Sequence, residues 1–429
     1  MTDRRDVSIR VPVLARVEGE GALELDIAGG EIRELKLRIF EPPRLFEKLL
    51  EGRSYAEVPD IVARICGICP VAYQMSAVQA LESLFGVEVT PWVRDMRRAM
   101  YCGEWIESHA LHIHLLAAPD YLGLDDALAM AAQHGEILRR GLRLQGLGNE
   151  LIKLFGGRSV HPVGVRVGGF HHAPDVQAVR QLAARLRAAL PEADALLAWT
   201  ASLVLPEDDQ PFLSVALRHS AEYPMYAGRI ASSAGHDLGA EAYEQQFRES
   251  QVPHSTALYS HLDGAPYLVG PLARLNLNAD RLPATMRDTL PFALPSRNLF
   301  HSIVARAAEI RLALEEAATL LERYGLPDAP AVPLVPRAGI GFGATEAPRG
   351  LLWHRYETDS AGTIARARIV PPTSQNQARI EADLRNSLNA FGLDRMDDEL
   401  RLRAETVIRN YDPCISCATH FLRLEVRRS

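Results

Sequence analysis

The chain has 429 residues, of which 47% are hydrophobic and 24% charged, so it can bury a large core and is neither disordered nor fibrous. Its net charge of −7 and sequence pI near 6.1 provide no broad basic surface, which argues against nucleic acid as a partner. Five cysteines without a secretory signal indicate reduced thiols rather than a disulfide framework.

The N-terminal part, residues 1–55, is predicted to contain a β-hairpin. Between Gly21 and Phe40, apolar and polar residues alternate on both sides of Gly29 and Gly30, which suit a tight turn. The alternation implies one buried face. The residues expected to share it are Leu23, Leu25 and Ile27.

Two stretches were considered as export or membrane signals. Arg4 and Arg5 match the start of a twin-arginine signal, but no apolar region or cleavage site follows them. The longest apolar run, Ala195 to Leu205, is too short to cross a bilayer and ends at Pro206. We therefore expect no membrane segment and a cytoplasmic location.

A first Cys-x-x-Cys pair, Cys66 and Cys69, stands directly before Pro70 and an apolar run of helical character. Proline suits the first position of a helix, so Cys69 is predicted at the N-cap. The helix dipole and free N–H groups at such a position favour a thiolate.

The middle of the chain is predicted to be mainly helical, because apolar residues recur there with the period of a helix. The amphipathic stretches are Pro91 to Ala118, Asp125 to Phe155, Pro174 to Trp199, Arg297 to Tyr324 and Asn376 to Phe391. A second strand pair is predicted from Leu351 to Val370, with the turn at Asp359 to Gly362.

A second Cys-x-x-Cys pair, Cys414 and Cys417, lies near the other end, with His420 three residues further on. Asp412 suits an N-cap and Pro413 a first helical position, so the two thiols and the imidazole are predicted on nearly one face of a helix. Four thiolates select a soft metal: zinc, an iron–sulfur cluster, copper(I), or thiolate-bound nickel or iron.

The two pairs cooperate only if both ends of the chain meet in one core. This requirement favours a single domain over residues 1–429, of the α+β class and mainly α, with a helical-bundle core and small peripheral β-hairpins. A four-cysteine zinc site remains the structural alternative. Zinc ribbons commonly close short loops, whereas these pairs are separated by most of the chain.

The flanks of the pairs resemble the large subunit of nickel–iron hydrogenases. The blocks that carry the resemblance are, in chain order, "RVEGEG", "RICGICP", "GGRSVHPVGVRVGGF", "EAPRGLLWH", "VPPTSQN" and "DPCISCATH". Together they extend over nearly the whole chain, and they imply the fold of that subunit. "EPPRLFE" with "CGICPVAYQM" resembles the cytosolic branch that couples hydrogen to pyridine nucleotides, the sulfhydrogenases.

The resemblance implies the catalytic subunit of a hydrogenase, an oxidoreductase that cleaves H2 heterolytically and reversibly into protons and electrons. It also implies an iron–sulfur small subunit, flavin diaphorase subunits that bind NAD(P), and a maturation endopeptidase that removes residues 421–429. A hydrogen sensor with the same site and a structural zinc protein are the alternatives. A quinone-linked complex I relative is disfavoured because all four cysteines are present.

Matching the family motifs residue by residue implies two cofactors. Cys66 and Cys414 would be terminal ligands of nickel, and Cys69 and Cys417 would bridge nickel to an iron that carries one carbon monoxide and two cyanides, a Ni–Fe(CN)2(CO) centre. The family's Mg²⁺ would be bound by three groups. They are the carboxylate of Glu47, the carbonyl of Arg368 and the imidazole of His420.

Four further residues receive roles from the resemblance. Arg349 is expected over the open metal edge, with Asp120 as the acid that pairs with it, and Thr373 is expected to bond the second cyanide. Glu18 matches the family's proton-relay glutamate; without the resemblance it would be taken for a solvated strand carboxylate. The family often has a histidine where this chain has Tyr73, so no histidine is assigned there.

Three other features are interpreted as structural. "ESHALHIH" at Glu107 to His114 lacks the Glu-x-x-His spacing of di-iron sites, so core histidines are expected. "GIGFGA" at Gly339 matches a dinucleotide fingerprint, but nearby prolines disfavour the strand and helix that the motif needs. Cys102 is expected to be a small buried apolar residue.

Overall fold

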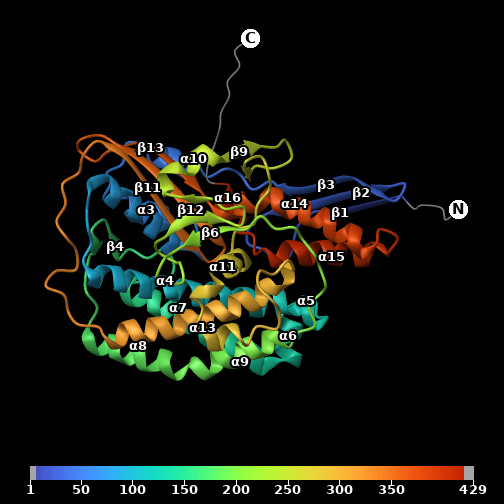
Figure 1. Ribbon diagram of the computed structural model, residues 1–429, viewed down its shortest axis with the longest axis horizontal. Coiled ribbons are helices and arrows are strands. Elements are labelled where there is room, and N and C mark those ends of the chain that lie inside the picture. The colour runs from blue at the N-terminus through green and yellow to red at the C-terminus, as the bar shows by residue number, and fades with distance from the viewer. Residues whose placement is uncertain (1–5, 420–429) are drawn as a thin grey trace, which may run out of the picture.

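The computed structural model describes residues 6–419 and shows a layer of long helices beneath several small antiparallel sheets (Figure 1). The helices of this layer are α4 Pro91–Leu111, α7 Gly135–Gly156, α8 Val176–Ala188, α9 Leu190–Ala201 and α13 Ser302–Glu322. Three other long helices, α3 Pro70–Phe85, α14 Pro372–Phe391 and α15 Asp397–Asn410, lie beside the sheets. The short ones are α1 Phe46–Leu50, α2 Val58–Val62, α5 Ala118–Leu122, α6 Ala127–Gln133, α10 Tyr243–Gln246, α11 Pro271–Asn278, α12 Ala284–Arg287 and α16 Ile415–Ala418. A π-helix, η1 His112–Ala117, continues α4, and 3-10 turns occupy η2 Ala240–Ala242, η3 Ala279–Arg281 and η4 Leu299–His301.

Within residues 6–419 the strands form three three-stranded sheets and two hairpins, and neighbouring strands in each are antiparallel. The sheets are β1 Val7–Val11, β2 Gly21–Ala28 and β3 Glu31–Ile39; β6 Val215–Arg218, β7 Arg229–Ser232 and β8 Asp237–Leu238; and β11 Gly339–Ala347, β12 Gly350–Thr358 and β13 Ile364–Val370. The hairpins are β4 Val165–Arg166 with β5 Gly169–Phe170, and β9 Phe247–Gln251 with β10 Leu258–Leu262. The predicted fold class is therefore confirmed.

The N-terminal hairpin is confirmed as β2 and β3. Gly29 and Gly30 turn the chain with φ of 61° and 78°, the left-handed region that favours glycine. The predicted face, made of Leu23, Leu25 and Ile27, is at most 2% exposed. The sheet also contains β1, which the sequence did not predict, and it packs on α14 and α15.

The predicted strand pair near residue 360 is confirmed as β12 and β13, and β11 completes the sheet. The "GIGFGA" segment forms β11 and not a phosphate-binding turn. Gly343 is needed there because β11 crosses α3 closely: an added Cβ would lie 2.2 Å from the carbonyl oxygen of Ser76. The glycines of this motif therefore serve packing between strand and helix.

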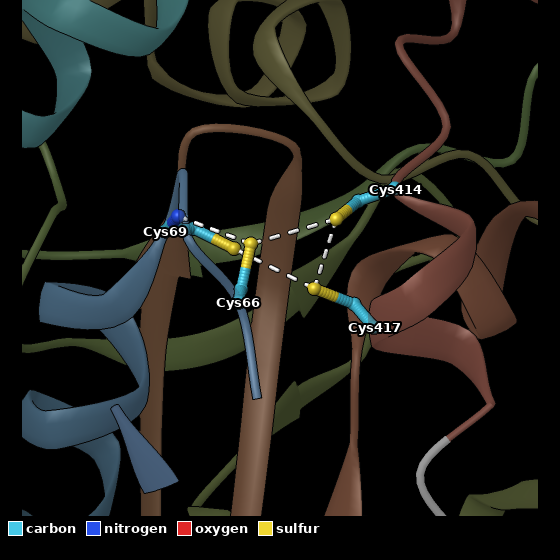
Figure 2. A group of neighbouring side chains, drawn as sticks. All are labelled: Cys66, Cys69, Cys414 and Cys417. Carbon is cyan, nitrogen blue, oxygen red and sulfur yellow. Dashed lines mark hydrogen bonds between the residues drawn. The ribbon is translucent and has the colours of Figure 1, made fainter. Parts of the chain in front are cut away.

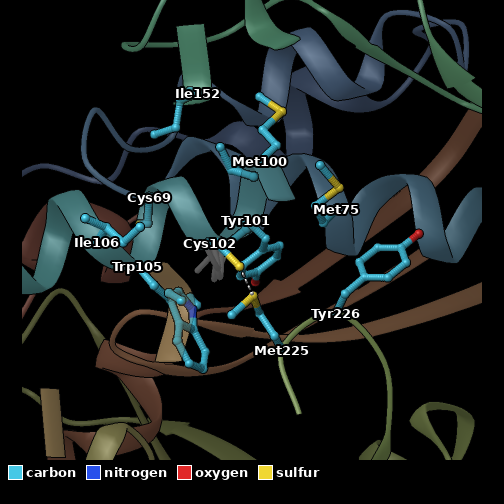
Figure 3. Close-up of a cluster of buried hydrophobic side chains, with 14 of the residues drawn as sticks. Cys69, Met75, Met100, Tyr101, Cys102, Trp105, Ile106, Ile152, Met225 and Tyr226 are labelled. Carbon is cyan, nitrogen blue, oxygen red and sulfur yellow. Dashed lines mark hydrogen bonds between the residues drawn. The ribbon is translucent and has the colours of Figure 1, made fainter. Parts of the chain in front are cut away.

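The helical core is centred on α4, which packs against α7 and α13. At the α4–α7 crossing, Gly103 and Gly148 bring the two backbones so close that a Cβ on either one would clash with the other's carbonyl oxygen. Figure 3 shows Cys102 in this core, with its Sγ 4.0 Å from Sδ of Met225. Cys102 is fully buried, as predicted for a small apolar residue.

Three predicted helices have different bounds in the structure. The first ends in the π-helix η1, the second is broken at His134 between α6 and α7, and the third is broken at Ala189, after which α9 begins at Leu190. Helix α15 was not predicted, because its sequence is highly charged and few apolar residues mark its buried face. Among the described residues, no helix combines the length and apolar character needed to span a bilayer.

Candidate metal centre

The four paired cysteines meet at one buried point (Figure 2). All four Sγ atoms lie within 4.8 Å of one another, and none of the four residues is more than 4% exposed. The Sγ–Sγ distances are 3.5 Å for Cys66–Cys414, 3.7 Å for Cys69–Cys417 and 3.0 Å for Cys414–Cys417. The expected convergence of the two ends of the chain is therefore confirmed.

The first pair is held by the start of α3. Cys69 is the N-cap of this helix and Pro70 its first residue, as predicted. Sγ of Cys66 accepts hydrogen bonds from the backbone N–H groups of Ile68 at 3.3 Å and Cys69 at 3.2 Å. The buried carboxyl of Glu104, on α4, accepts hydrogen bonds from two more N–H groups of the first turn, at 2.5 and 3.0 Å, so the start of α3 is held by its own backbone and by one neighbouring helix.

The second pair lies on a shorter helix than predicted. The helix begins at Ile415, and Cys414 itself is the N-cap. Asp412 cannot be the N-cap, because its φ of 55° is left-handed whereas an N-cap residue is extended. His420 lies outside the described residues.

In this conformation Asp412 is bound by Arg349. The Arg349 guanidinium donates from Nε to the carbonyl oxygen of Asp412 at 2.8 Å and from Nη2 to its Oδ1 at 3.0 Å. Both side chains are 2% exposed. The expectation that Asp120 pairs with Arg349 is therefore wrong: Arg349, from the turn between β11 and β12, pairs with the residue two positions before Cys414.

Asp120 has a different place in the structure. Its carboxylate accepts hydrogen bonds from Arg409, at 2.7 and 2.9 Å, and from Arg16. These bonds join the end of α15 to the loop that carries Glu18. The buried carboxylate of Asp120 thus links two segments that reach the cysteines.

Glu18 lies directly against the second pair. The thiol of Cys414 donates to its Oε2 at 3.0 Å, and the N–H of Ser416 donates to the same oxygen at 3.1 Å. The backbone carbonyl of Glu18 also accepts from the N–H of Ile415 at 2.9 Å. Glu18 is half-buried, so it stands between the sulfur atoms and the outside of the protein.

The thiols differ in their affinity for protons. Burial raises the pKa of Cys69 well above its usual range, and contacts with the other thiols together with burial do the same for Cys414. Burial also opposes ionisation of Cys66, but hydrogen bonds from the other thiols and the charge of Arg349 outweigh it and hold the pKa of Cys66 well below the usual value. Binding of a metal to the four sulfur atoms must therefore release protons.

The comparisons identify the family. The family model described as nickel-dependent hydrogenase matches residues 44–142 and 261–420. The chain belongs to this family. It is 33% identical over 423 residues to sulfhydrogenase 1 subunit alpha of Pyrococcus furiosus, which covers 97% of this chain and 98% of the relative. It is 27% identical over 472 residues to NAD-reducing hydrogenase HoxS subunit beta of Cupriavidus necator, which covers 95% and 94%.

A solved structure of an NAD+-reducing [NiFe]-hydrogenase in the H2-reduced state superimposes with a TM-score of 0.87. The sequences are 29% identical, and the match covers 96% of this chain and 99% of that one. The protein is thus a hydrogenase large subunit, an oxidoreductase acting on H2, and its family implies a nickel–iron centre. The donor set fits such a centre, because four convergent sulfur atoms provide soft ligands.

Three more predicted residues of the hydrogenase lie beside the cysteines or on and beside strand β13. The hydroxyl of Thr373, at the start of α14, accepts the N–H of Cys414 at 3.0 Å. Glu47 of α1 accepts the N–H of Ile369 at 2.7 Å, which places it next to Arg368. The side chain of Arg368 itself pairs with Glu244 and Glu249.

Sequence reasoning missed three groups. The sequence predicts only a helix cap at Asp412. Its position two residues before Cys414, in one of the blocks that carry the resemblance, is the signal that could have identified it as the partner of Arg349. Tyr73 is fully buried, and burial together with Cys417 and Cys69 raises the pKa of its hydroxyl well above the usual value. Ser416 donates to Glu41 at 3.0 Å, so a second carboxylate follows Glu18 on the way out; nothing in the sequence pattern indicates this contact.

The histidines of the "ESHALHIH" stretch are core residues, as expected. His109 bonds to Glu309 at 2.9 Å, and His112 and His114 bond to backbone carbonyls at 2.8 Å. Within residues 6–419, the four cysteines are the only group of three or more metal-ligating side chains close enough to share an ion.

Proposed function

We propose that the four cysteines hold the nickel–iron centre, with Cys66 and Cys414 as terminal ligands of nickel and Cys69 and Cys417 as bridges to an iron that carries carbon monoxide and cyanide. The observation that carries this proposal is the convergence of four buried Sγ atoms from two distant segments. When bound, the centre supplies an electron-rich, incompletely coordinated metal pair that polarises and cleaves H2.

Glu18 receives the proton that the cleavage releases beside Cys414. Each H2 yields two protons and two electrons, so a buried site needs a carrier that takes protons from the sulfur atoms towards water. The bond of 3.0 Å between Cys414 Sγ and Glu18 Oε2 provides the first step. Ser416, which donates to Oε2 of Glu41 at 3.0 Å, and then Glu41 offer the next positions.

Arg349 orients a group at the open side of the centre. A guanidinium is a poor base, so its contribution is charge and hydrogen bonding rather than proton transfer. Among the described residues Nη1 of Arg349 has no partner, although it is buried. This N–H group is therefore available to a cyanide or to hydrogen, while Thr373 bonds the second cyanide.

Glu47, the carbonyl oxygen of Arg368 and His420 would hold a magnesium ion. Carboxylate, carbonyl and water oxygens are the ligands that Mg²⁺ prefers. The bond between Glu47 and the N–H of Ile369 supports this assignment, because it places the carboxylate beside Arg368.

The electrons leave through a second subunit. Four of the five cysteines are at the centre, and the fifth, Cys102, is buried alone in the helical core, so this chain has no cysteine set for an iron–sulfur cluster. An iron–sulfur small subunit must therefore receive the electrons. The NAD-reducing relatives favour a cytoplasmic complex in which diaphorase subunits pass them to NAD(P).

The test is to purify the complex from its source under reducing conditions and to measure metals, infrared spectra and H2-dependent reduction of NAD(P). Nickel and iron near one per chain, with carbonyl and cyanide bands, are expected. Zinc alone would contradict the proposal and favour the structural zinc protein. Metal and bands without turnover with any acceptor, including an artificial dye, would favour the hydrogen sensor.

Maturation provides a further test. We expect an endopeptidase to remove residues 421–429 after the metals are inserted, so active enzyme should have the mass of a chain that ends at His420. An intact mass that corresponds to all 429 residues would contradict this expectation.

A further inference from the structure

The turn of residues 409–412, which leads into Cys414, is held by three buried side chains from distant elements. His112, the first residue of the π-helix, donates from Nε2 to the first carbonyl oxygen of this turn at 2.8 Å. Arg306 of α13 donates from Nη1 to the second carbonyl oxygen at 3.4 Å. Arg349 binds the last residue of the turn through two hydrogen bonds.

Besides Nη1 of Arg349, three buried polar atoms on the residues that form or hold this turn have no partner among the described residues. They are Nδ1 of His112, Nε of Arg306 and Oδ2 of Asp412. The three residues are 0%, 1% and 3% exposed, respectively. A buried polar group without a hydrogen bond is costly, so three around one turn call for a ligand that satisfies them.

Arg306 provides a further argument for a bound ligand. Within residues 6–419, no carboxylate lies within ion-pair distance of its guanidinium. Burial lowers the pKa of Arg306 to about 10, and the charge of Asp412 only partly opposes this effect. Arg306 is therefore still protonated at neutral pH, and its Nε is a donor.

The other two atoms are acceptors. His112 donates from Nε2 to a carbonyl oxygen, so in the neutral ring Nδ1 carries no hydrogen. Burial lowers the pKa of His112 to about 3, which keeps the ring neutral. Oδ2 of Asp412 is also an acceptor, because the other oxygen of this carboxylate is paired with the guanidinium of Arg349. One donor and two acceptors are the complement of a water molecule, which accepts one hydrogen bond and donates two.

We propose that an ordered water is bound behind the Arg349–Asp412 pair, where it accepts from Nε of Arg306 and donates to Oδ2 of Asp412 and Nδ1 of His112. Through this water Arg306 is a positioning residue: it fixes the Asp412 carboxylate, which in turn fixes Arg349 over the cysteines. Three hydrogen bonds are typical of buried waters in proteins. The proposal rests on the proposed function only for the role of Arg349.

The direct test is a high-resolution crystal structure of the assembled enzyme. We expect a water within hydrogen-bond distance of all three atoms. A direct contact between Arg306 Nε and Asp412 Oδ2 with no water between them would overturn the proposal. This readout does not depend on which metal is bound, so it separates failure of this proposal from failure of the nickel–iron assignment.

The role of Arg306 is tested by Arg306→Lys in the assembled holoenzyme, with Arg140→Lys as the control. Lysine keeps the charge but has no Nε–H at this place, so Asp412 and Arg349 lose their fixed orientation. We expect kcat to fall about ten- to a hundredfold, the usual effect of losing an outer hydrogen-bond partner of a metal site, with nickel and iron retained and the carbonyl and cyanide bands shifted. Arg140 is another arginine with unpartnered buried nitrogens among the described residues, and the charged groups around it are Glu192, Arg143 and Glu136 rather than the cysteines. Its replacement should leave both readouts unchanged.

A second variant covers the outcome in which Arg306→Lys fails to fold. In His112→Gln the side-chain amide can still donate to the turn's first carbonyl oxygen, but the bare ring nitrogen is lost. The water should then be displaced or disordered and the infrared bands shifted. Unchanged bands and kcat in either folded variant, or loss of the metals from Arg306→Lys, would contradict a positioning role.

Discussion

The two Cys-x-x-Cys pairs have the same spacing but are held in different ways. Cys66 and Cys69 lie at the start of a sixteen-residue helix, and their N–H partners come from the next few residues of the chain. Cys414 and Cys417 lie on a four-residue helix whose position depends on Glu18, Arg349 and Thr373.

This difference assigns different tasks to the pairs. A long helix in the core provides a rigid base, because its first turn is fixed by its own backbone and by Glu104. The second pair is placed by acid, guanidinium and hydroxyl groups that are also the candidates for handling protons and hydrogen. We infer that the first pair mainly anchors the metals, whereas the surroundings of the second pair carry out the chemistry.

The largest expected effect comes from removing a thiol of either pair. Cys69→Ala and Cys417→Ala should both reduce H2 oxidation to background and lower nickel and iron far below one per chain, because each pair supplies half of one site. The matched control is Cys102→Ala, which removes a buried sulfur from the helical core. It should keep metals and activity at a cost of about 1 kcal/mol in stability. Full metal content in Cys417→Ala would show that the pairs do not share the centre.

Glu18→Gln tests the proton step at the second pair. The amide keeps the shape of the side chain but cannot ionise, so metals and infrared bands should be retained while H2 oxidation and evolution both fall by about 10²- to 10⁴-fold. Glu20→Gln, at an exposed position two residues away, is the control and should turn over like the parent. Activity of Glu18→Gln near the parental rate would exclude it as the proton carrier.

Arg349→Lys and Asp120→Asn distinguish the two buried acid–arginine clusters. Arg349→Lys should retain the metals, shift the cyanide bands and reduce kcat about ten- to a hundredfold, because lysine cannot form both bonds to Asp412.

Asp120→Asn should instead destabilise the protein by about 3 kcal/mol, since it leaves the buried Arg409 without its main carboxylate, and leave the bands unchanged. Shifted infrared bands in Asp120→Asn would show that Asp120 does act on the metal centre.

The smallest expected effect is a dependence of stability on pH. Burial lowers the pKa of His109 to about 4, that of His112 to about 3 and that of His114 to about 4, all below the ordinary value of 6.5. Protonation therefore favours the unfolded chain, so their contribution is present above pH 6.5 and is lost as the pH falls towards 4. Each should contribute a slope of up to about 1.4 kcal/mol per pH unit in that window.

Urea unfolding at pH 7 and at pH 5 measures this slope. His112→Gln should flatten it, whereas His172→Gln, at an exposed position, should not. Hydrogen exchange adds a sharper comparison: the amides of the 409–412 turn should lose protection at acid pH before those of α3, because only the turn is held by His112. Equal loss in both regions would contradict the different modes of support.

The parts of the fold that could be predicted are those fixed by nearby residues. Alternation around Gly29 and Gly30 determines the first hairpin, and Pro70 determines where α3 begins. The convergence of the cysteines followed from chemistry, because four thiols in matched pairs need a common metal. The predicted start of the last helix at Asp412 was wrong, although aspartate and proline favour it locally. In the structure Asp412 instead binds Arg349, 63 residues away, and a contact at this separation is not visible in the local sequence.

The same limit explains the error at Asp120. Its partners Arg16 and Arg409 are 104 and 289 residues away, and both compete with Arg349 for one carboxylate. A sequence motif shows that an acid is present but does not show which of several arginines reaches it. Packing decides the pairing, since only one arrangement brings α15 and the Glu18 loop together around this side chain.

The separation of the two pairs along the chain also has a consequence in time. Cys66 and Cys414 are 348 residues apart, so at about 5–20 residues per second the ribosome needs roughly 20 to 70 seconds to add the second pair after the first. During that interval Cys66 and Cys69 have been synthesised, whereas Cys414 and Cys417 have not. The first two thiols must therefore stay reduced and free of competing metals until synthesis reaches the second pair, and insertion of the centre can only follow it.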